Sequence, residues 1–243
     1  MADFGKNILY FHKVTSTFDE LAKLPPENGL AVVADSQTGG IGRNGRAWVS
    51  DVGGAYFSFY ILPKGNVQSI PFLAIVCALA AHNAISRYAP CAIKWPNDIV
   101  VDGKKVCGIL TKSAFYGDDS VYVMAGIGIN ANNTDFGELD YRATSLKLIT
   151  GKDFDRNKLV EEFFVEFNKI YLNLSNEEII SRYKESCITL GSYVAVHYNT
   201  DGTVFEGKCV DVRIDGSLDI ETENEIINVN AGEVSVRGVY GYV

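Results

Sequence analysis

Four glycines and two arginines stand together in the segment 39–48, whose sequence is GGIGRNGRAW. Glycine lets the backbone take positive φ and approach a ligand closely, and successive backbone N–H groups can then form an anion-binding nest. Arginine adds forked donors that suit a phosphate or a carboxylate. These residue types in this spacing predict an anion-binding loop. The alternative is a glycine-rich hairpin whose arginines are solvated.

The same segment contains a literal G-x-G-x-x-G at Gly40, Gly42 and Gly45. In a dinucleotide-binding fold this motif must follow a strand and open a helix. Residues 30–34 do read as a strand, but 55–62 (AYFSFYIL) have the alternating aromatic pattern of another strand. The loop is therefore followed by a strand, which excludes the Rossmann interpretation.

A second polar cluster is the run 94–98 (KWPND), which is followed closely by Lys104 and Lys105. A strand should end at its proline, and the two-residue turn at 102–103 (DG) favours a hairpin that returns the lysines to the same neighbourhood. Cations placed beside a carboxylate could act on a charged substrate. Alternatively, the polar residues cap a turn and the lysines are solvated charges on a sheet edge.

A third cluster is 126–133 (GIGINANN), a predicted strand that ends in asparagines. Its glycines leave room for a flat ligand, and the side chain of Asn130 offers both a donor and an acceptor. Asparagines also commonly end strands, so this cluster alone is a weak indication of a site.

The elements that must position these clusters follow from the hydrophobic pattern. Residues 67–88 are apolar on nearly every side, which predicts a helix buried against a sheet. Short connections between strands predict at least three antiparallel neighbours. Helices are predicted at 16–24, 67–88, 154–174 and 177–187, and strands at 30–34, 55–62, 92–95, 99–101, 105–113 and 120–130.

The pattern changes after Gly191. Turn clusters such as NTDG and DG separate five short segments of alternating polarity. Short strands at regular spacing are typical of a small barrel. The predicted strands are 192–198, 203–212, 217–221, 225–229 and 233–237, and the domain boundary is placed near 187–191.

Composition and charge limit which binding partners and which cellular location are expected. A net charge of -8 and a pI of about 4.9 argue against a nucleic-acid-binding surface, which needs a basic face. The five cysteines are scattered and the three histidines lie far apart, so neither a zinc site nor a disulfide framework is predicted. The N-terminus lacks an apolar signal segment, and the apolar stretch 70–85 is short for a membrane span. We therefore expect a cytoplasmic protein without a membrane partner.

Together and in order, the three clusters resemble the hallmarks of the biotin protein ligase (biotin-[acetyl-CoA-carboxylase] ligase) family, over essentially the whole chain. The family motifs G-R-G-R-x-G-R-x-W, K-W-P-N-D with K-x-x-G-I-L, and G-[IL]-N-x-N correspond to 40–48, 94–98 with 105–110, and 128–132. The resemblance implies an α+β fold: a class II synthetase-like catalytic domain at 1–188, with a mixed sheet and flanking helices, then an SH3-like barrel at 189–243. It also implies the short form, without a DNA-binding domain.

The resemblance implies that biotin and ATP give biotinyl-5′-AMP and pyrophosphate. Biotin then passes to a lysine on the biotin carboxyl carrier domain of a biotin-dependent carboxylase. A carboxylate and a triphosphate must be brought together, and fixed cations offset their repulsion. Magnesium is expected on the phosphates. A homodimer fits the resemblance, and no nucleic-acid partner is expected.

The resemblance also assigns roles to residues. Arg43, Lys105 and Asp98 are the predicted catalytic residues, and Asp98 would orient Lys94 or act as general base for the acceptor lysine. The predicted biotin-binding residues are Ser16, Thr17, Phe18, Gln37, Gly40, Ile41, Gly42, Arg43, Lys105 and Gly108. The predicted ATP-binding residues are Arg43, Arg46, Trp48, Lys94, Asn97, Lys105 and Asn130, and no residue is predicted to bind a metal ion directly.

Two positions depart from the family pattern. Ile41 stands where the family has the first arginine of the loop, and Phe18 stands where it has an asparagine. A polar side-chain contact is therefore not expected at either position.

Two other functions are alternatives to the ligation of biotin. Lipoate or octanoate ligases share the fold by resemblance, but a linear acyl pocket does not require Gln37 and Thr17 as polar partners for a ring. The alternative that is not an enzyme is a regulatory module that responds to biotinyl-adenylate. The charge of -8 and the absence of a predicted helix-turn-helix before the first strand count against it.

Overall fold

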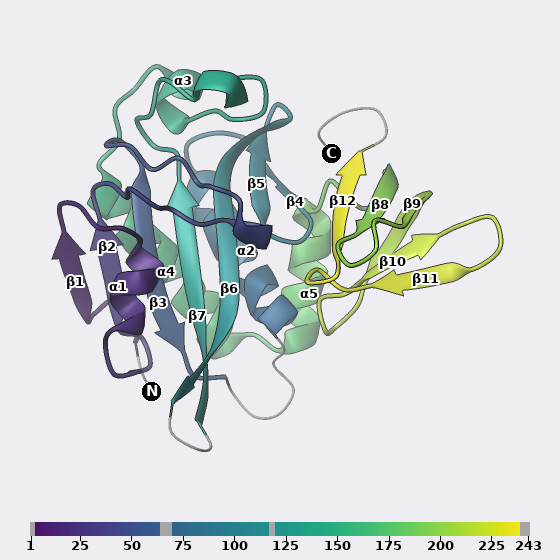
Figure 1. Ribbon diagram of the computed structural model, residues 1–243, viewed down its shortest axis with the longest axis horizontal. Helices are drawn as coiled ribbons and strands as arrows, with labels where there is room; N and C mark the ends of the chain where they lie inside the picture. Colours follow the sequence, from purple (N-terminus) through teal and green to yellow (C-terminus); the bar gives the residue numbers. More distant parts are fainter. Residues whose placement is uncertain (1–2, 64–69, 117–119, 239–243) are drawn as a thin grey trace.

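The computed structural model describes residues 3–63, 70–116 and 120–238 of the 243-residue chain. Its larger part is a seven-stranded mixed sheet in the order β1-β2-β3-β7-β6-β5-β4 (Figure 1). Strands β1 and β2 run parallel, and every other neighbouring pair of described strands is antiparallel. The strands are β1 (Ile8–Phe11), β2 (Ala31–Ala34), β3 (Ala55–Ile61), β4 (Ala92–Lys94), β5 (Asp98–Val101), β6 (Lys104–Tyr116) and β7 (Ser120–Ile129).

Helices cover both faces of this sheet (Figure 1). Helices α2 (Ile70–Ile85), α4 (Arg156–Asn173) and α5 (Asn176–Ser186) lie on one face, and α1 (Thr17–Ala22) packs on the other. As predicted, α2 is buried on nearly all sides, because it packs on the sheet and is flanked by α4 and α5. The remaining helical segments are η1 (Arg43–Gly45), η2 (Gly137–Leu139) and α3 (Leu146–Thr150).

Aromatic side chains join α4 to the centre of the sheet. Phe57 and Phe59 of β3 meet Phe163 of α4 edge to face, with ring centroids 5.0 and 5.8 Å apart. Phe167 meets Phe59 in the same way at 5.1 Å. All four rings are fully buried. Edge-to-face pairs add about 0.5–1.5 kcal/mol each to the free energy gained by burial, so this cluster holds α4 on the sheet.

We expect Phe163→Ala to lower the free energy of unfolding by about 3–5 kcal/mol, because it removes a buried ring and leaves a cavity. Val165 lies on the exposed side of the same helix, and Val165→Ala should change that free energy by about 0.5 kcal/mol or less. Urea unfolding followed by tryptophan fluorescence measures both. Similar values for the two variants would contradict the packing described.

The C-terminal part forms a second, antiparallel sheet of five strands in the order β11-β10-β9-β8-β12. One face of this sheet is buried and carries Val194, Val196, Cys209, Leu218 and Ile220. The five predicted strands are confirmed. They are β8 (Tyr193–Tyr198), β9 (Val204–Val212), β10 (Leu218–Glu221), β11 (Ile226–Val229) and β12 (Val234–Gly238).

This second sheet is SH3-like and strongly curled. Its edge strands β11 and β12 are joined by only four residues, 230–233. A flat sheet of five strands is about 19 Å wide, so a link this short can join opposite edges only if the sheet curls. In the described residues the two edge strands do not pair with each other, and the barrel is not closed.

The predicted helices and strands are found with shifts of a few residues at their ends, and residues 67–69 of the predicted helix 67–88 lie outside the described residues. Strand β1 and helix α3 were not predicted. Both are short, and β1 has no alternating pattern, since Leu9, Tyr10 and Phe11 are all exposed. None of the described helices is long and apolar enough to cross a lipid bilayer.

Candidate active site

A cleft lies over the centre of the large sheet, on the face that carries α1. Successive residues of a strand point to opposite faces, and on this face β3, β6 and β7 present the small residues Ser58, Gly108, Gly126 and Gly128. The cavity on this face has a volume of about 780 Å³ and extends from α1 to β12 of the second sheet. Cavities of about 300–1,000 Å³ hold small-molecule ligands.

The cleft brings together almost all of the predicted site residues, although they are distant in the sequence. Gly40 is the exception among them, because it does not line the cleft. A Cβ there would lie 2.5 Å from Ser50 Oγ and from the Trp48 carbonyl oxygen, so Gly40 instead lets two parts of the loop pack closely. The residues that do line it are Ser16, Thr17, Phe18, Gln37, Ile41, Gly42, Arg43, Arg46, Trp48, Lys94, Asn97, Asp98, Lys105, Gly108 and Asn130.

Ser58, Arg142 and Arg237 are among the lining residues that the sequence analysis does not predict. Ser58 interrupts the aromatic run of β3, and a single polar residue in an otherwise apolar strand is a sequence signal of such a site. Arg142 and Arg237 stand in segments without a recognisable motif, and only the tertiary structure brings them to the cleft.

The end of the cleft beside α1 carries uncharged hydrogen-bonding groups. Thr17 Oγ1 lies 2.8 Å from Ser58 Oγ and 3.1 Å from Gln37 Oε1, which also accepts from the Thr17 backbone N–H at 2.8 Å. Gln37 Nε2 donates to Ser50 Oγ at 2.8 Å. These bonds fix hydroxyl and amide groups where a compact polar part of a ligand could bind.

Phe18 forms an apolar wall next to this polar end. Its ring lies against Gly126, where a Cβ would come within 2.6 Å of the ring. The Lys112 ammonium lies 5.7 Å from the ring centroid. Ser16 caps α1 by accepting from the Phe18 N–H at 3.1 Å. The position thus offers packing rather than a polar side-chain contact, as the sequence predicts.

The segment 39–48 folds as a hairpin over the cleft. The Gly42 N–H donates to the Arg46 carbonyl at 2.7 Å, and the Trp48 N–H donates to the Gly40 carbonyl at 2.8 Å. At its tip, Asn44 and Gly45 take positive φ values of 55° and 70°, which asparagine and glycine adopt most readily. The hairpin alternative is therefore correct for the backbone, but it places Arg43 in the cleft rather than in solvent.

Trp48 lies flat on two glycines of the sheet. A Cβ at Gly128 would lie 2.5 Å from Trp48 Nε1, and a Cβ at Gly108 would lie 2.9 Å from Trp48 Cζ3. Trp48 Nε1 is buried and has no hydrogen-bond acceptor among the described residues. Because buried donors are normally paired, this N–H is a candidate donor to a bound ligand.

The guanidinium of Arg43 is held by neutral acceptors. Its Nη1 donates to Asn97 Oδ1 at 3.2 Å, and its Nη2 donates to the Val234 carbonyl at 3.1 Å and to the Ala231 carbonyl. Burial lowers the pKa of Arg43, with Asp98 opposing this shift and Arg46 adding to it. A buried cation with neutral acceptors is suited to bind an anion.

Two lysines and one carboxylate complete the cationic end of the cleft. Lys105 Nζ lies 2.6 Å from Asp98 Oδ1 and 5.0 Å from the centroid of the Trp48 ring. Lys94 is only 8% exposed. Its burial lowers its pKa to about 8, an effect that Asp98 opposes and that the nearby cations Lys105, Arg142 and Arg237 increase.

The two predicted asparagines of the cleft are largely occupied by the protein. Asn97 accepts from Arg43 and donates to the Ile109 carbonyl, so it uses both ends of its amide. Asn130 is buried, and its Nδ2 donates to the Thr144 carbonyl at 3.0 Å and to the Lys105 carbonyl at 3.4 Å. Asn97 can therefore position Arg43, and Asn130 can offer its Oδ1 to a ligand.

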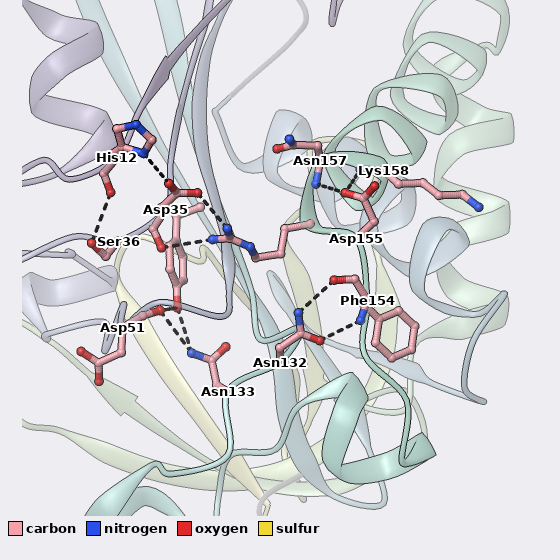
Figure 2. A network of polar contacts seen from close by, with 12 residues as sticks. His12, Asp35, Ser36, Asp51, Asn132, Asn133, Phe154, Asp155, Asn157 and Lys158 are labelled. Atoms are coloured by element: carbon pink, nitrogen blue, oxygen red, sulfur yellow. Dashed lines mark hydrogen bonds and ion pairs between the residues drawn. The ribbon is translucent and has the colours of Figure 1, made fainter.

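The next two asparagines of the third cluster, Asn132 and Asn133, do not line the cleft but join a polar network shown in Figure 2. Asn132 exchanges two hydrogen bonds with the backbone of Phe154, at 2.8 and 2.9 Å, just before α4. Asn133 Nδ2 donates to the Tyr56 hydroxyl at 3.1 Å. Their role is to fix the loop that follows β7.

A family model described as the biotin/lipoate A/B protein ligase family matches residues 8–130, about half of the chain. The chain belongs to this family. The resemblance drawn from the three motifs is thereby confirmed. The ligase-family match ends at Asn130, so Arg142 and the residues contributed by the second sheet lie beyond it.

Relatives and solved structures extend the likeness to nearly the whole chain. The Bifunctional ligase/repressor BirA of Bacillus spizizenii is 33% identical over 243 residues, which cover 96% of this chain and 74% of the relative. The biotin-[acetyl-CoA-carboxylase] ligase of Mycobacterium tuberculosis is 28% identical over 220 residues, 85% of this chain and 79% of the relative. Biotin protein ligase from Aquifex aeolicus in complex with biotin and ATP has a TM-score of 0.84 at 32% identity, with coverage of 96% of this chain and 99% of that one.

Proposed function

We propose that this protein is an ATP-dependent biotin-[acetyl-CoA-carboxylase] ligase. One observation carries the proposal: a single cleft has an uncharged polar end at Thr17, Ser58 and Gln37 and a cationic end at Arg43, Lys94 and Lys105. Biotin has the matching halves, since its ureido ring is neutral and its carboxylate must meet the phosphates of ATP.

In the first step a carboxylate oxygen of biotin attacks the α-phosphorus of ATP. The bond from this phosphorus to the β-phosphate oxygen breaks, and pyrophosphate leaves. Arg43 and Lys105 neutralise the carboxylate and the α-phosphate, and Lys94 and Arg46 bind the other phosphates. The protein thus acts by electrostatic stabilisation and positioning, without a nucleophile of its own.

In the second step the ε-amine of an acceptor lysine attacks the carbonyl carbon of the mixed anhydride. AMP leaves, and an amide forms. The amine must lose a proton to react, so a base is required. Asp98 is the proposed base, or it orients Lys94, and its contact with Lys105 at 2.6 Å keeps it beside the reacting groups.

Ligand positions follow from the two ends of the cleft. Ser16, Thr17, Phe18 and Gln37 would surround the ring of biotin, with Ile41, Gly42 and Gly108 along its chain. Trp48 would shield the adenine, and Asn130 would offer its Oδ1 to the adenine edge.

We propose that magnesium enters the cleft bound to the phosphates of ATP, where it would neutralise part of their charge. Among the described residues no cluster of three His, Cys, Asp or Glu side chains could hold a metal ion. Asp98 is the one carboxylate among the described residues that line the cleft. The donor set therefore fits an ion carried by the nucleotide rather than one bound in a protein cage.

We expect the affinity for ATP to fall as the pH rises above about 8, because the buried Lys94 has a pKa of about 8. Below this pH the free protein carries the Lys94 proton, and above it the proton is lost. A bound triphosphate favours the charged ammonium, so binding at a pH slightly above this pKa should take up a proton. Calorimetric titration with ATP in two buffers of different ionisation enthalpy measures that uptake.

The matched variant for this prediction is Lys94→Arg. A guanidinium keeps its proton throughout this pH range, so the variant should bind ATP without proton uptake. Equal proton uptake by the wild type and Lys94→Arg would assign the titration to another group.

The transfer reaction tests the proposed function as a whole. The protein is incubated with biotin, ATP, magnesium and a biotin carboxyl carrier domain as acceptor, and the mass of the acceptor is then measured by mass spectrometry. We expect one biotinyl group per acceptor, and none on an acceptor whose target lysine is replaced by arginine. An unmodified acceptor, together with no consumption of ATP, would contradict the proposal.

Lipoate or octanoate ligation is the second enzymatic candidate, because the family includes lipoate ligases by name. The hydroxyl and amide groups of Thr17, Ser58 and Gln37 favour a ring with polar edges over a linear acyl chain. Octanoate and lipoate should therefore fail to compete with biotin at equal concentration.

Gene regulation is the candidate function that is not enzymatic, since the Bacillus relative is named a ligase/repressor. The net charge of -8 argues against a DNA-binding surface. An electrophoretic mobility shift with and without biotin and ATP tests this directly, and we expect no shift.

We also propose that the catalytic domain spans 1–188, that the C-terminal domain spans 189–243 and that the protein acts in the cytoplasm. A homodimer is proposed at the edge strand β1, where Leu9, Tyr10 and Phe11 are 40%, 55% and 38% exposed. Analytical ultracentrifugation with and without ligands measures the oligomeric state.

A further inference from the structure

We propose that the turn between β11 and β12 holds Arg43 in its working position, and that Asn199 is the positioning residue that ties this turn to the glycine loop. What Arg43 does in that position rests on the proposed function. The contacts that hold it there can be tested without any activity.

The guanidinium of Arg43 joins the two sheets. Its Nη2 donates to the carbonyls of Ala231 and Val234, at the two ends of the turn, while its Nη1 donates to Asn97 Oδ1 beside β5. Three of its five N–H donors are thus used by the protein. A planar guanidinium fixed at three points keeps one orientation, whereas an arginine side chain without such contacts samples many rotamers.

Asn199 follows β8 and reaches both the turn and the loop. Its backbone N–H donates to the Glu233 carbonyl at 2.8 Å, and its Nδ2 donates to the Gly232 carbonyl at 3.3 Å. Its Oδ1 accepts from Asn44 Nδ2 and from Ser235 Oγ, both at 3.3 Å. One exposed side chain therefore bridges the middle of the turn and the residue next to Arg43.

The geometry favours a productive hold over an inhibitory one. Arg43 still lines the cleft while it is bound by the turn, beside Asp98, whose charge acts on its pKa. Each hydrogen bond of Asn199 contributes little by itself. Together they set the position of a cation, and misplacing a catalytic group by about 1 Å can reduce a rate by about 100-fold.

The first test needs no substrate. Hydrogen exchange of the ligand-free protein is compared for the wild type, Asn199→Ala and the matched control Asn224→Ala. Asn224 lies exposed in the neighbouring β10–β11 turn, where its backbone N–H donates a hydrogen bond to Thr222 Oγ1. We expect Asn199→Ala to speed exchange across residues 40–48 by about tenfold or more, as expected when a local opening becomes more frequent, and Asn224→Ala to leave it unchanged.

The second test separates positioning from a general structural role. Asn199→Ala should lower the rate of biotinyl-adenylate formation by about tenfold, with a much smaller change in the KM for biotin, since the ring of biotin binds at the other end of the cleft. In an Arg43→Ala background, Asn199→Ala should have no further effect, because it acts through Arg43.

Several results would overturn the inference. Unchanged exchange in Asn199→Ala would show that the turn does not hold the loop, whatever the protein catalyses. An equal loss of rate with and without Arg43 would indicate a structural role alone, and a faster reaction would show that the turn holds Arg43 away from the substrate. A wild-type protein that forms no biotinyl-adenylate would refute the proposed function, and the exchange experiment would still decide whether the turn holds the loop.

Discussion

Replacement of Lys105 by alanine is expected to slow biotinyl-adenylate formation by about 100- to 1,000-fold, the usual effect of removing one fixed group that stabilises charge in a transition state. Lys105 lies 2.6 Å from Asp98 and over the ring of Trp48, at the junction of the proposed biotin and ATP positions. Without it, the carboxylate and the α-phosphate would meet with one cation fewer. Release of pyrophosphate measures the rate.

The control for Lys105→Ala is Lys104→Ala. Lys104 is the preceding residue of β6, but it is exposed and its Nζ donates to the Asp140 carbonyl at 2.8 Å, outside the cleft. The side chain of Lys105 is 23% exposed, so it is less solvated than an edge lysine would be. Thermal unfolding of both variants should therefore be recorded, and Lys105→Gln provides a variant of similar size. A wild-type rate in Lys105→Ala would remove this residue from the mechanism.

Arg43→Gly is expected to let biotinyl-5′-AMP escape about 100-fold faster, since two charge-assisted hydrogen bonds of about 1.5 kcal/mol each would be lost. Ile41 cannot replace this cation, because it stands in the same loop with an apolar side chain. Free biotinyl-adenylate should accumulate, and biotin should appear on lysines of unrelated proteins added to the reaction. Filtration and mass spectrometry measure the free intermediate.

Arg182→Ala is the control for Arg43→Gly. Arg182 is exposed on α5, away from the cleft, so removing it changes the net charge by the same amount without touching the site. Retention of the intermediate by Arg43→Gly as in the wild type would show that another group holds the adenylate.

Much of the site is predictable because three local motifs carry it. The glycine loop, the KWPND run and the GIN run each keep their functional residues within a few positions, and the strand order β3-β7-β6-β5 brings the three motifs together. Arg142 and Arg237 are different. They reach the cleft from a loop after β7 and from the last strand of the second sheet, so their placement depends on tertiary structure that no local pattern encodes.

Local sequence also misses which side-chain groups the protein itself uses. Asn130 has the donors and the acceptor that a ligand requires, but its Nδ2 is committed to two backbone carbonyls. Arg43 looks like a solvated loop residue until the carbonyls of Ala231 and Val234 are found beside it. The backbone groups concerned are 188 and 191 positions away from Arg43, and 14 and 25 positions away from Asn130.

The fold follows the same division. The strands of the second sheet can be predicted because one face of the sheet is buried and the other is exposed to solvent, which makes the polarity of their residues alternate. Strand β1 is not readable, since it pairs with β2 at the sheet edge while Leu9, Tyr10 and Phe11 all remain exposed.

If one cleft activates biotin with ATP, the intermediate should be directly detectable. The protein is incubated with biotin, ATP and magnesium without an acceptor, and the bound products are released and analysed by mass spectrometry. We expect about one biotinyl-5′-AMP per cleft, as for an intermediate that the site retains, with release of pyrophosphate and no adenylate when lipoate or octanoate replaces biotin. Absence of biotinyl-5′-AMP from a folded protein that binds both biotin and ATP would contradict the account.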